Sequence, residues 1–144
     1  MKATLRAWLE LSRVSNLPTV WTNCAAAWLL CGGSGADIRL FWILFGASLV
    51  YTAGMILNDA ADVSFDREQR PERPIPSGRI RPRSAWRAGL IMLLCGGGMM
   101  AGRGGSDVTV TVLLAVAVLG YDLYHKPWPG SVVVMGGCRT LLYL

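Results

Sequence analysis

The sequence Asn58-Asp59-Ala60-Ala61-Asp62-Val63-Ser64-Phe65-Asp66-Arg67 follows directly on an apolar run that is long enough to cross a bilayer. If the helix of that run continues, at about 100° per residue, one amide and three carboxylates fall within an arc of roughly 100°. Carboxylates three and four residues apart repel one another, and the C-terminal end of a helix is itself negative. Such a stripe is unfavourable unless a positive group lies in it. A hard divalent cation that also binds phosphate oxygens fits best, because Mg²⁺ combines a few carboxylates with substrate phosphates.

The distribution of charge along the chain predicts a membrane protein. Of the 144 residues, 53% are hydrophobic and only 16% are charged, and residues 14–36 and 40–58 carry no charge at all. Two later uncharged runs are shorter and reach spanning length only if charged end residues extend to the interface. We therefore predict an all-α membrane protein with about four to five transmembrane helices, near residues 14–33, 39–58, 84–102, 107–122 and 131–144.

Lysine and arginine residues predict the orientation in the membrane. Eleven of them fall in the N-terminus, the segment 58–87 and the segment after the fourth apolar run, whereas Arg39 and Arg103 fall on the opposite side. This bias places the 59–83 loop at the cytoplasmic face of the inner (cell) membrane. No stretch alternates aromatic and basic residues as a nucleic-acid surface would, so we expect no nucleic-acid partner. The sequence leaves the oligomeric state open.

Polar residues at the start of the first apolar run have two possible roles. Arg13, Asn16 and Thr19 share one helix face, and they could simply anchor this end of the helix at the membrane interface. We favour the interpretation that Arg13 and Asn16 face the same cavity as the acidic stripe. Asn23 lies deeper, where an amide needs either an interhelical partner or a cavity.

Basic residues follow the acidic stripe in the sequence. Seven arginines lie between residues 67 and 87, and the guanidinium group suits phosphate oxygens, although topology alone would make this loop basic. Arg67 and Arg73 lie nearest the stripe and are the preferred functional candidates. Tyr121 and Lys126 are equally consistent with an interfacial anchor and with a phosphate contact. The pattern Gly98-xxx-Gly102 indicates close helix packing or a short turn.

Two of these segments carry a family resemblance. The motif Asn58-Asp59-x-x-Asp62-x-x-x-Asp66-Arg67, followed by Arg73-Pro74-Ile75-Pro76-Ser77-Gly78, resembles the first Asp-rich motif of the UbiA family of intramembrane prenyltransferases. The segment from Tyr121 to Lys126 is similar to the second cytoplasmic Tyr…Lys element of that family. Arg13 occupies the place of the family's basic residue at the entrance to the first helix.

The resemblance implies a fold and an activity. Family members are bundles of nine transmembrane helices around a cavity that opens laterally to lipid. They transfer a prenyl group from a prenyl diphosphate to a small acceptor, often aromatic, in lipid-soluble quinone or related biosynthesis, and they use Mg²⁺. The resemblance assigns metal binding to Asn58, Asp59, Asp62 and Asp66, catalysis to Asp62, Asp66, Arg67 and Lys126, and substrate binding to Asn58, Arg13, Asn16, Arg73 and Tyr121.

The chain also departs from the family pattern. Members have a second Asp-rich motif after their sixth helix, and this chain stops inside its fifth. We therefore expect residues 1–144 to be the N-terminal part of a single prenyltransferase domain that is incomplete alone. The alternative is a non-catalytic membrane subunit or a truncated, inactive half-enzyme. A transporter would require charges at mid-membrane, whereas these carboxylates lie at a helix end.

Overall fold

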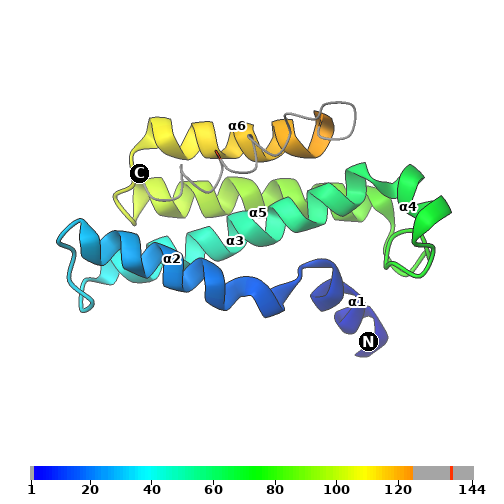
Figure 1. Ribbon diagram of the computed structural model, residues 1–144, viewed down its shortest axis with the longest axis horizontal. Coiled ribbons are helices and arrows are strands. Elements are labelled where there is room, and N and C mark those ends of the chain that lie inside the picture. Colours follow the sequence, from blue (N-terminus) through cyan, green and yellow to red (C-terminus); the bar gives the residue numbers. More distant parts are fainter. Residues whose placement is uncertain (1, 125–136, 138–144) are drawn as a thin grey trace.

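The computed structural model describes residues 2–124 and 137, and this part of the chain contains helices and no strand. In Figure 1, α3 and α5 run side by side through the bundle, while α2 packs against α3 and α6 against both. The predicted all-α fold is therefore confirmed. The elements are α1 (Lys2–Leu11), the short 3₁₀ helix η1 (Val14–Asn16), α2 (Leu17–Leu30), α3 (Ile38–Ala61), α4 (Val63–Gln69), α5 (Pro82–Gly102) and α6 (Val108–Tyr124).

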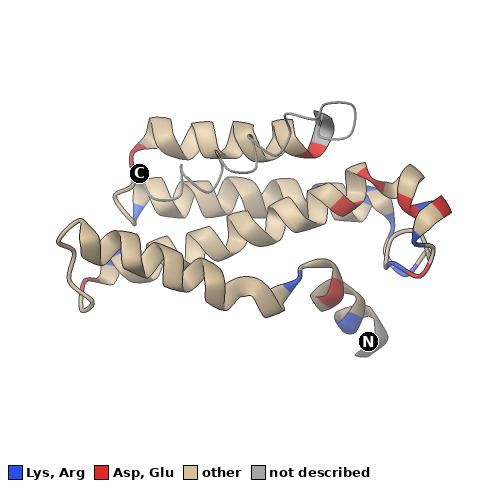
Figure 2. Ribbon diagram, viewed as in Figure 1, with Lys and Arg blue, Asp and Glu red and all other residues tan. Residues whose placement is uncertain are grey.

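Helices lie near four of the five positions predicted for spans, and two of the described helices qualify as spans by length and composition. Helices α3 and α5 are long and apolar enough to cross a bilayer, and α6 is a shorter apolar helix. Helix α2 has 14 residues and so extends about 21 Å, which is less than a hydrocarbon core of roughly 30 Å. Figure 2 shows that charged residues gather at the two ends of the bundle and leave the middle of these helices uncharged. The predicted span 131–144 lies outside the described residues.

The loop predicted at 59–83 is shorter than expected. Helix α3 continues to Ala61 and α4 follows almost without interruption, because the backbone N–H groups of Asp62 and Asp66 donate to the carbonyl oxygens four residues earlier. Only residues 70–81 connect α4 to α5 without a helix. The acidic motif is thus carried on helical backbone except at Asp62, where α3 ends and α4 begins.

Close packing of α3 against α5 depends on glycine. A Cβ atom built on Gly96 would lie 2.7 Å from the carbonyl oxygen of Gly46 and 2.9 Å from the Cβ atom of Leu49. Among the described residues, no atom lies within 4 Å of a Cβ atom built on Gly98 or Gly102, so this pair makes no close helix contact within that part of the chain. The two helix backbones meet at Gly46 and Gly96 instead.

An amphipathic N-terminal helix closes one end of the bundle. Ala7 and Leu11 of α1 are buried in a cluster with Ile75 and Ile80 of the 70–81 connection and with residues of α3 and α5. An exposed ion pair between Glu10 and Arg79, 2.9 Å long, joins the same two segments. Helix α1 and the 70–81 connection therefore form one layer beside the end of α3.

The backbone between α1 and η1 has an unusual conformation. Arg13 has φ +46° and ψ +45°, and among the described residues it is the one non-glycine residue with a positive φ. This left-handed conformation is unfavourable for a residue with a Cβ atom. It breaks the helix and turns the chain from α1 into α2, whose second residue is Pro18, where a proline is tolerated.

Helix α6 begins with a capping carboxylate. The side chain of Asp107 accepts a hydrogen bond from the backbone N–H of Val110 at 3.0 Å. This hydrogen bond lowers the pKa of Asp107 below its ordinary value, because it favours the charged carboxylate. The cap fixes the start of α6 at the end of the bundle opposite to the acidic motif (Figure 2).

Candidate functional site

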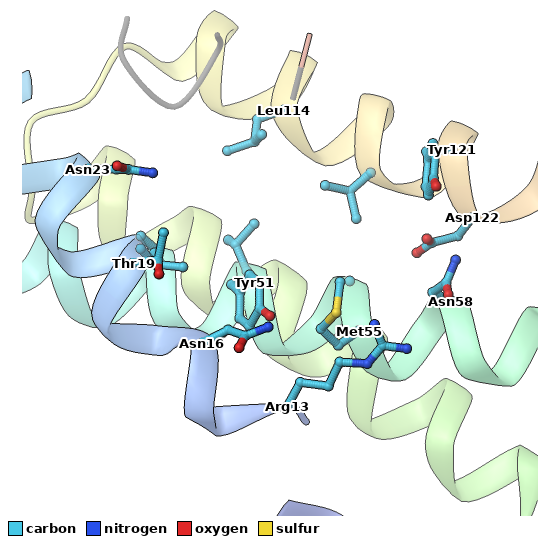
Figure 3. Close-up of a pocket in the computed structure, with 15 residues that line it drawn as sticks. Arg13, Asn16, Thr19, Asn23, Tyr51, Met55, Asn58, Leu114, Tyr121 and Asp122 are labelled. Atoms are coloured by element: carbon cyan, nitrogen blue, oxygen red, sulfur yellow. The ribbon is translucent and has the colours of Figure 1, made fainter. Parts of the chain in front are cut away.

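A cavity of about 630 Å³ lies between α2, α3 and α6. Figure 3 shows charged and polar side chains gathered at one end of it, with Arg13, Asn58 and Asp122 close to this end and Asn23 at the other. Between them the walls are largely apolar. The apolar lining residues are Val20, Ala47, Val50, Gly54, Met55, Leu114 and Val118, and the polar ones are Arg13, Asn16, Thr19, Asn23, Tyr51, Asn58, Tyr121 and Asp122.

The charged end of the cavity is formed by two helices that face one another. Asn58 projects from the last turns of α3, and its amide group points toward the carboxyl group of Asp122 on α6 (Figure 3) and donates a hydrogen bond to it. Asp122 is only 5% exposed, and its Oδ2 atom has no hydrogen-bond partner among the described residues. The site therefore contains a buried carboxylate oxygen without a partner, on a residue that lines the cavity.

The acidic stripe is divided between two surroundings. Asn58 lines the cavity, whereas Asp59 and Asp66 lie on the other edge of the stripe and face arginine side chains. Arg73 donates to Asp66 Oδ2 at 2.7 Å and to Asp59 Oδ1 at 3.2 Å. The same Asp59 oxygen accepts from Arg13 at 3.3 Å. Two guanidinium groups thus share one carboxylate oxygen.

Burial makes the contact between Arg73 and Asp66 the strongest of these ion pairs. The side chain of Asp66 is 1% exposed and that of Arg73 is 21% exposed. A carboxylate removed from water requires a compensating charge, and removing that charge is costly. Asp66 Oδ1 remains without a hydrogen-bond partner among the described residues. Arg73 consequently ties the 70–81 connection to α4 and to the end of α3.

The remaining predicted site residues are placed as follows. Arg13, Asn16 and Tyr121 line the cavity together with Asn58. Asp62 lies at the junction of α3 and α4, close enough to Asp59 and Asp122 for electrostatic repulsion. Arg67 is exposed on α4.

The structure does not describe one predicted site residue, and it does not bring the predicted metal ligands together. Lys126 lies outside the described residues. Among residues 2–124 and 137, no three acidic, histidine or cysteine side chains converge as a ready-made metal site. The carboxylates of the motif are instead distributed between the cavity side and the arginine side of α3 and α4.

Sequence reasoning missed Asp122 as a cavity residue. The available signal was its position, since it is the first charge after the fourth apolar run and emerges at the same end of the bundle as the motif. For Asn23, the sequence predicts either an interhelical partner or a cavity. The structure shows that Asn23 lines the cavity.

Comparisons with known proteins give a consistent result. The sequence model of the UbiA prenyltransferase family matches residues 19–144. A digeranylgeranylglyceryl phosphate synthase of Methanopyrus kandleri is 33% identical over 145 aligned positions, which cover 93% of this chain and 51% of the relative. A 4-hydroxybenzoate octaprenyltransferase of Pectobacterium carotovorum is 33% identical over 109 positions, which cover 74% of this chain and 37% of the relative.

A solved structure from work on digeranylgeranylglyceryl phosphate synthase in membranes has a similar fold. It superposes with a TM-score of 0.88 at 25% sequence identity, and the match covers 99% of this chain and 52% of that chain. The chain spans about half the length of this structure and of the first relative above.

Proposed function

Because this chain belongs to the UbiA prenyltransferase family, we propose that it forms the cavity and one diphosphate-binding end of a prenyltransferase. In this proposal a prenyl group passes from a prenyl diphosphate to a small acceptor. The bond between the allylic carbon and the diphosphate oxygen breaks, a bond from that carbon to the acceptor forms, and the acceptor loses a proton. The protein spans the inner membrane several times, with the acidic motif at the cytoplasmic face.

The observation that supports this most is a cavity with a charged end and apolar walls. A prenyl diphosphate has the same division, because its diphosphate is strongly anionic and its chain is a hydrocarbon. Arg13 and Asn58 lie at the charged end, while Leu114 is an apolar residue further in. The walls would keep water away from the allylic carbocation while the acceptor attacks it.

The oxygen groups at the charged end fit the Mg²⁺ that the family resemblance implies. Mg²⁺ prefers carboxylate and amide oxygens and takes further ligands from substrate phosphates and water, so it does not require a cage of three protein acids. Asn58 lines the cavity and Asp62 lies near Asp122, and these two residues would hold the ion. When bound, Mg²⁺ would stabilise the negative charge that develops on the departing diphosphate.

The other polar residues act around this centre. Asp59 and Asp66, which the resemblance also assigns to the metal, have arginine partners and in our proposal hold Arg13 and Arg73 in place. Arg13 would face the anionic end of a substrate. Asn16 and Tyr121 would contact substrate from the cavity wall, and Arg67 and Lys126 would neutralise the leaving diphosphate.

The acceptor class is proposed from the relatives. One relative is named for 4-hydroxybenzoate and another for a glyceryl phosphate lipid. We propose an aromatic acceptor in lipid-soluble quinone or related biosynthesis, and the glyceryl phosphate class is the competing substrate in the test. A non-catalytic or truncated form is the alternative that the same test addresses.

The test measures release of diphosphate and transfer of a labelled prenyl group by the protein reconstituted in lipid nanodiscs. The acceptor panel contains phenolic acids, quinone precursors and glyceryl phosphate lipids. We expect turnover that requires Mg²⁺ and falls by roughly 10²-fold or more in Asp62→Asn, as for loss of a group that stabilises transition-state charge. Asp37→Asn, at the opposite end of α3, is the matched control and should retain full turnover.

Two results would count against this proposal. Turnover that persists unchanged in Asp62→Asn or in EDTA would remove the metal-dependent mechanism. Absence of prenyl transfer to every acceptor, by wild-type protein that still binds Mn²⁺ and pyrophosphate, would favour the non-catalytic alternative.

A further inference from the structure

We propose that Asp122 is a further oxygen ligand of the metal and diphosphate site, contributed by α6 and facing the end of α3 across the cavity. This inference rests on the proposed function, because it concerns the same charged end of the cavity. It adds a second helix to a site that the acidic motif alone would place on α3 and α4.

The first argument is the position of the side chain. Asp122 lies in the last turn and a half of α6, lines the cavity and is 5% exposed. Its Oδ2 atom is buried and has no hydrogen-bond partner among the described residues. A buried carboxylate oxygen without a partner is costly, so such an atom normally serves a bound ion, water or ligand.

The second argument is the contact with Asn58. The amide N–H₂ group of Asn58 donates to the carboxyl group of Asp122, and Figure 3 shows the two groups facing one another. This hydrogen bond uses the N–H₂ group of the Asn58 side chain, so the side-chain oxygen of Asn58 could serve as a ligand. Groups that orient a metal ligand in this way affect metal affinity even when they do not touch the ion.

The third argument is the surrounding charge. Three acids are buried among the described residues, and two of them, Asp59 and Asp66, are paired with Arg73. None of the ion pairs of the described residues includes Asp122, which instead experiences repulsion from Asp62 and Asp59. A divalent cation between α3 and α6 would convert this repulsion into attraction.

The experiment titrates the protein in nanodiscs with Mn²⁺ in the presence of inorganic pyrophosphate and follows free Mn²⁺ by electron paramagnetic resonance. We expect Asp122→Asn, which keeps the shape of the side chain, to weaken Mn²⁺ binding by about tenfold or more. Asp107→Asn is the matched control at the other end of the same helix, and it should bind Mn²⁺ as the wild-type protein does. Thermal unfolding without metal shows whether each variant is folded.

The outcomes separate this inference from the proposed function. Wild-type Mn²⁺ affinity in a folded Asp122→Asn protein, with loss of affinity in Asp62→Asn, would overturn the role of Asp122 alone. Unchanged affinity in both variants would overturn the metal site itself. If Asp122→Asn does not fold, Asp122→Ser removes the same carboxylate, and the same criteria apply to it.

Discussion

At the scale of single residues, some side chains of the acidic motif line the cavity and others form ion pairs, and the spacing of the motif does not show which do which. Within an arc of roughly 100°, side chains only tens of degrees apart on a helix can meet different neighbours. Asn58 meets the cavity, whereas Asp59 and Asp66 meet Arg73, which arrives from the 70–81 connection. The buried pair of Asp66 and Arg73 is therefore a structural contact that can be tested apart from any activity.

We expect Arg73→Gln to lower the free energy of unfolding by about 2–3 kcal/mol, because it leaves Asp66 buried without a cation. This is less than the roughly 3–5 kcal/mol of a fully buried pair, since Arg73 is 21% exposed. Unfolding in mixed detergent micelles measures the change. Arg70→Gln, an exposed arginine nearby without an ion pair among the described residues, should change stability by no more than about 0.5 kcal/mol. Equal stability of the two variants would show that the pair contributes little.

How far the sequence predicts this site depends on where the partner of each residue lies. The cavity positions of Arg13, Asn16 and Asn58 are suggested by helical periodicity and by the ends of apolar runs, which are local properties, whereas these properties left the role of Tyr121 open. The partner of Asp66 and the depth of Asp122 depend on how distant segments pack, which no local spacing encodes. The arginine-rich loop indicated anion binding, yet Arg73 is occupied by the motif's own carboxylates.

At the scale of elements, α3 is the helix on which the others assemble. Helices α2, α5 and α6 all pack against it, and its apolar length was predicted to within three residues at either end. The helix contacts themselves were harder to predict. Small residues occur throughout α5, and only their rotation about the helix axis decides which of them meets α3. Gly96 does so, and Gly98, two residues further on, does not.

We expect Gly96→Ala to destabilise the protein by about 1–3 kcal/mol, because the new methyl group would lie 2.7 Å from a backbone oxygen of α3 that cannot easily move. The same detergent unfolding assay measures this. Gly98→Ala is the control on the same helix, with no atom within 4 Å. It should be neutral or slightly stabilising, since alanine favours a helix over glycine by roughly 0.5–1 kcal/mol. Similar losses in both variants would contradict the proposed packing.

At the scale of the whole molecule, the described helices make a bundle whose charges lie at its two ends (Figure 2). The acidic motif, the 70–81 connection and α1 share one end, and the short connections from α2 to α3 and from α5 to α6 share the other. The connections therefore lie at alternate ends of the bundle, as we assumed when we counted the lysine and arginine residues on each side of the membrane. Which of the two ends faces the cytoplasm is the part of our proposal that the next prediction tests.

We expect an impermeant maleimide to label Ser77→Cys only from the cytoplasmic side, and Ser34→Cys only from the opposite side, in a protein whose own cysteines have been replaced. Both serines are exposed, and they lie on connections at opposite ends of the bundle. Labelling of right-side-out and inverted membrane vesicles makes the comparison. Labelling of Ser77→Cys from the outer side would reverse the orientation, and labelling of both positions from one side would contradict the spanning arrangement.

The left-handed backbone at Arg13 has a consequence for how this position tolerates change. Glycine would adopt φ +46° with less strain than any other residue, so a residue chosen only to turn the chain from α1 to α2 would be glycine. The position is occupied by arginine, whose guanidinium group reaches both Asp59 and the cavity. The backbone conformation at this position therefore favours glycine, whereas the contacts of the side chain require arginine. Arg13→Gly would relieve the backbone strain between α1 and α2 and would at the same time remove the guanidinium group from Asp59 and from the cavity.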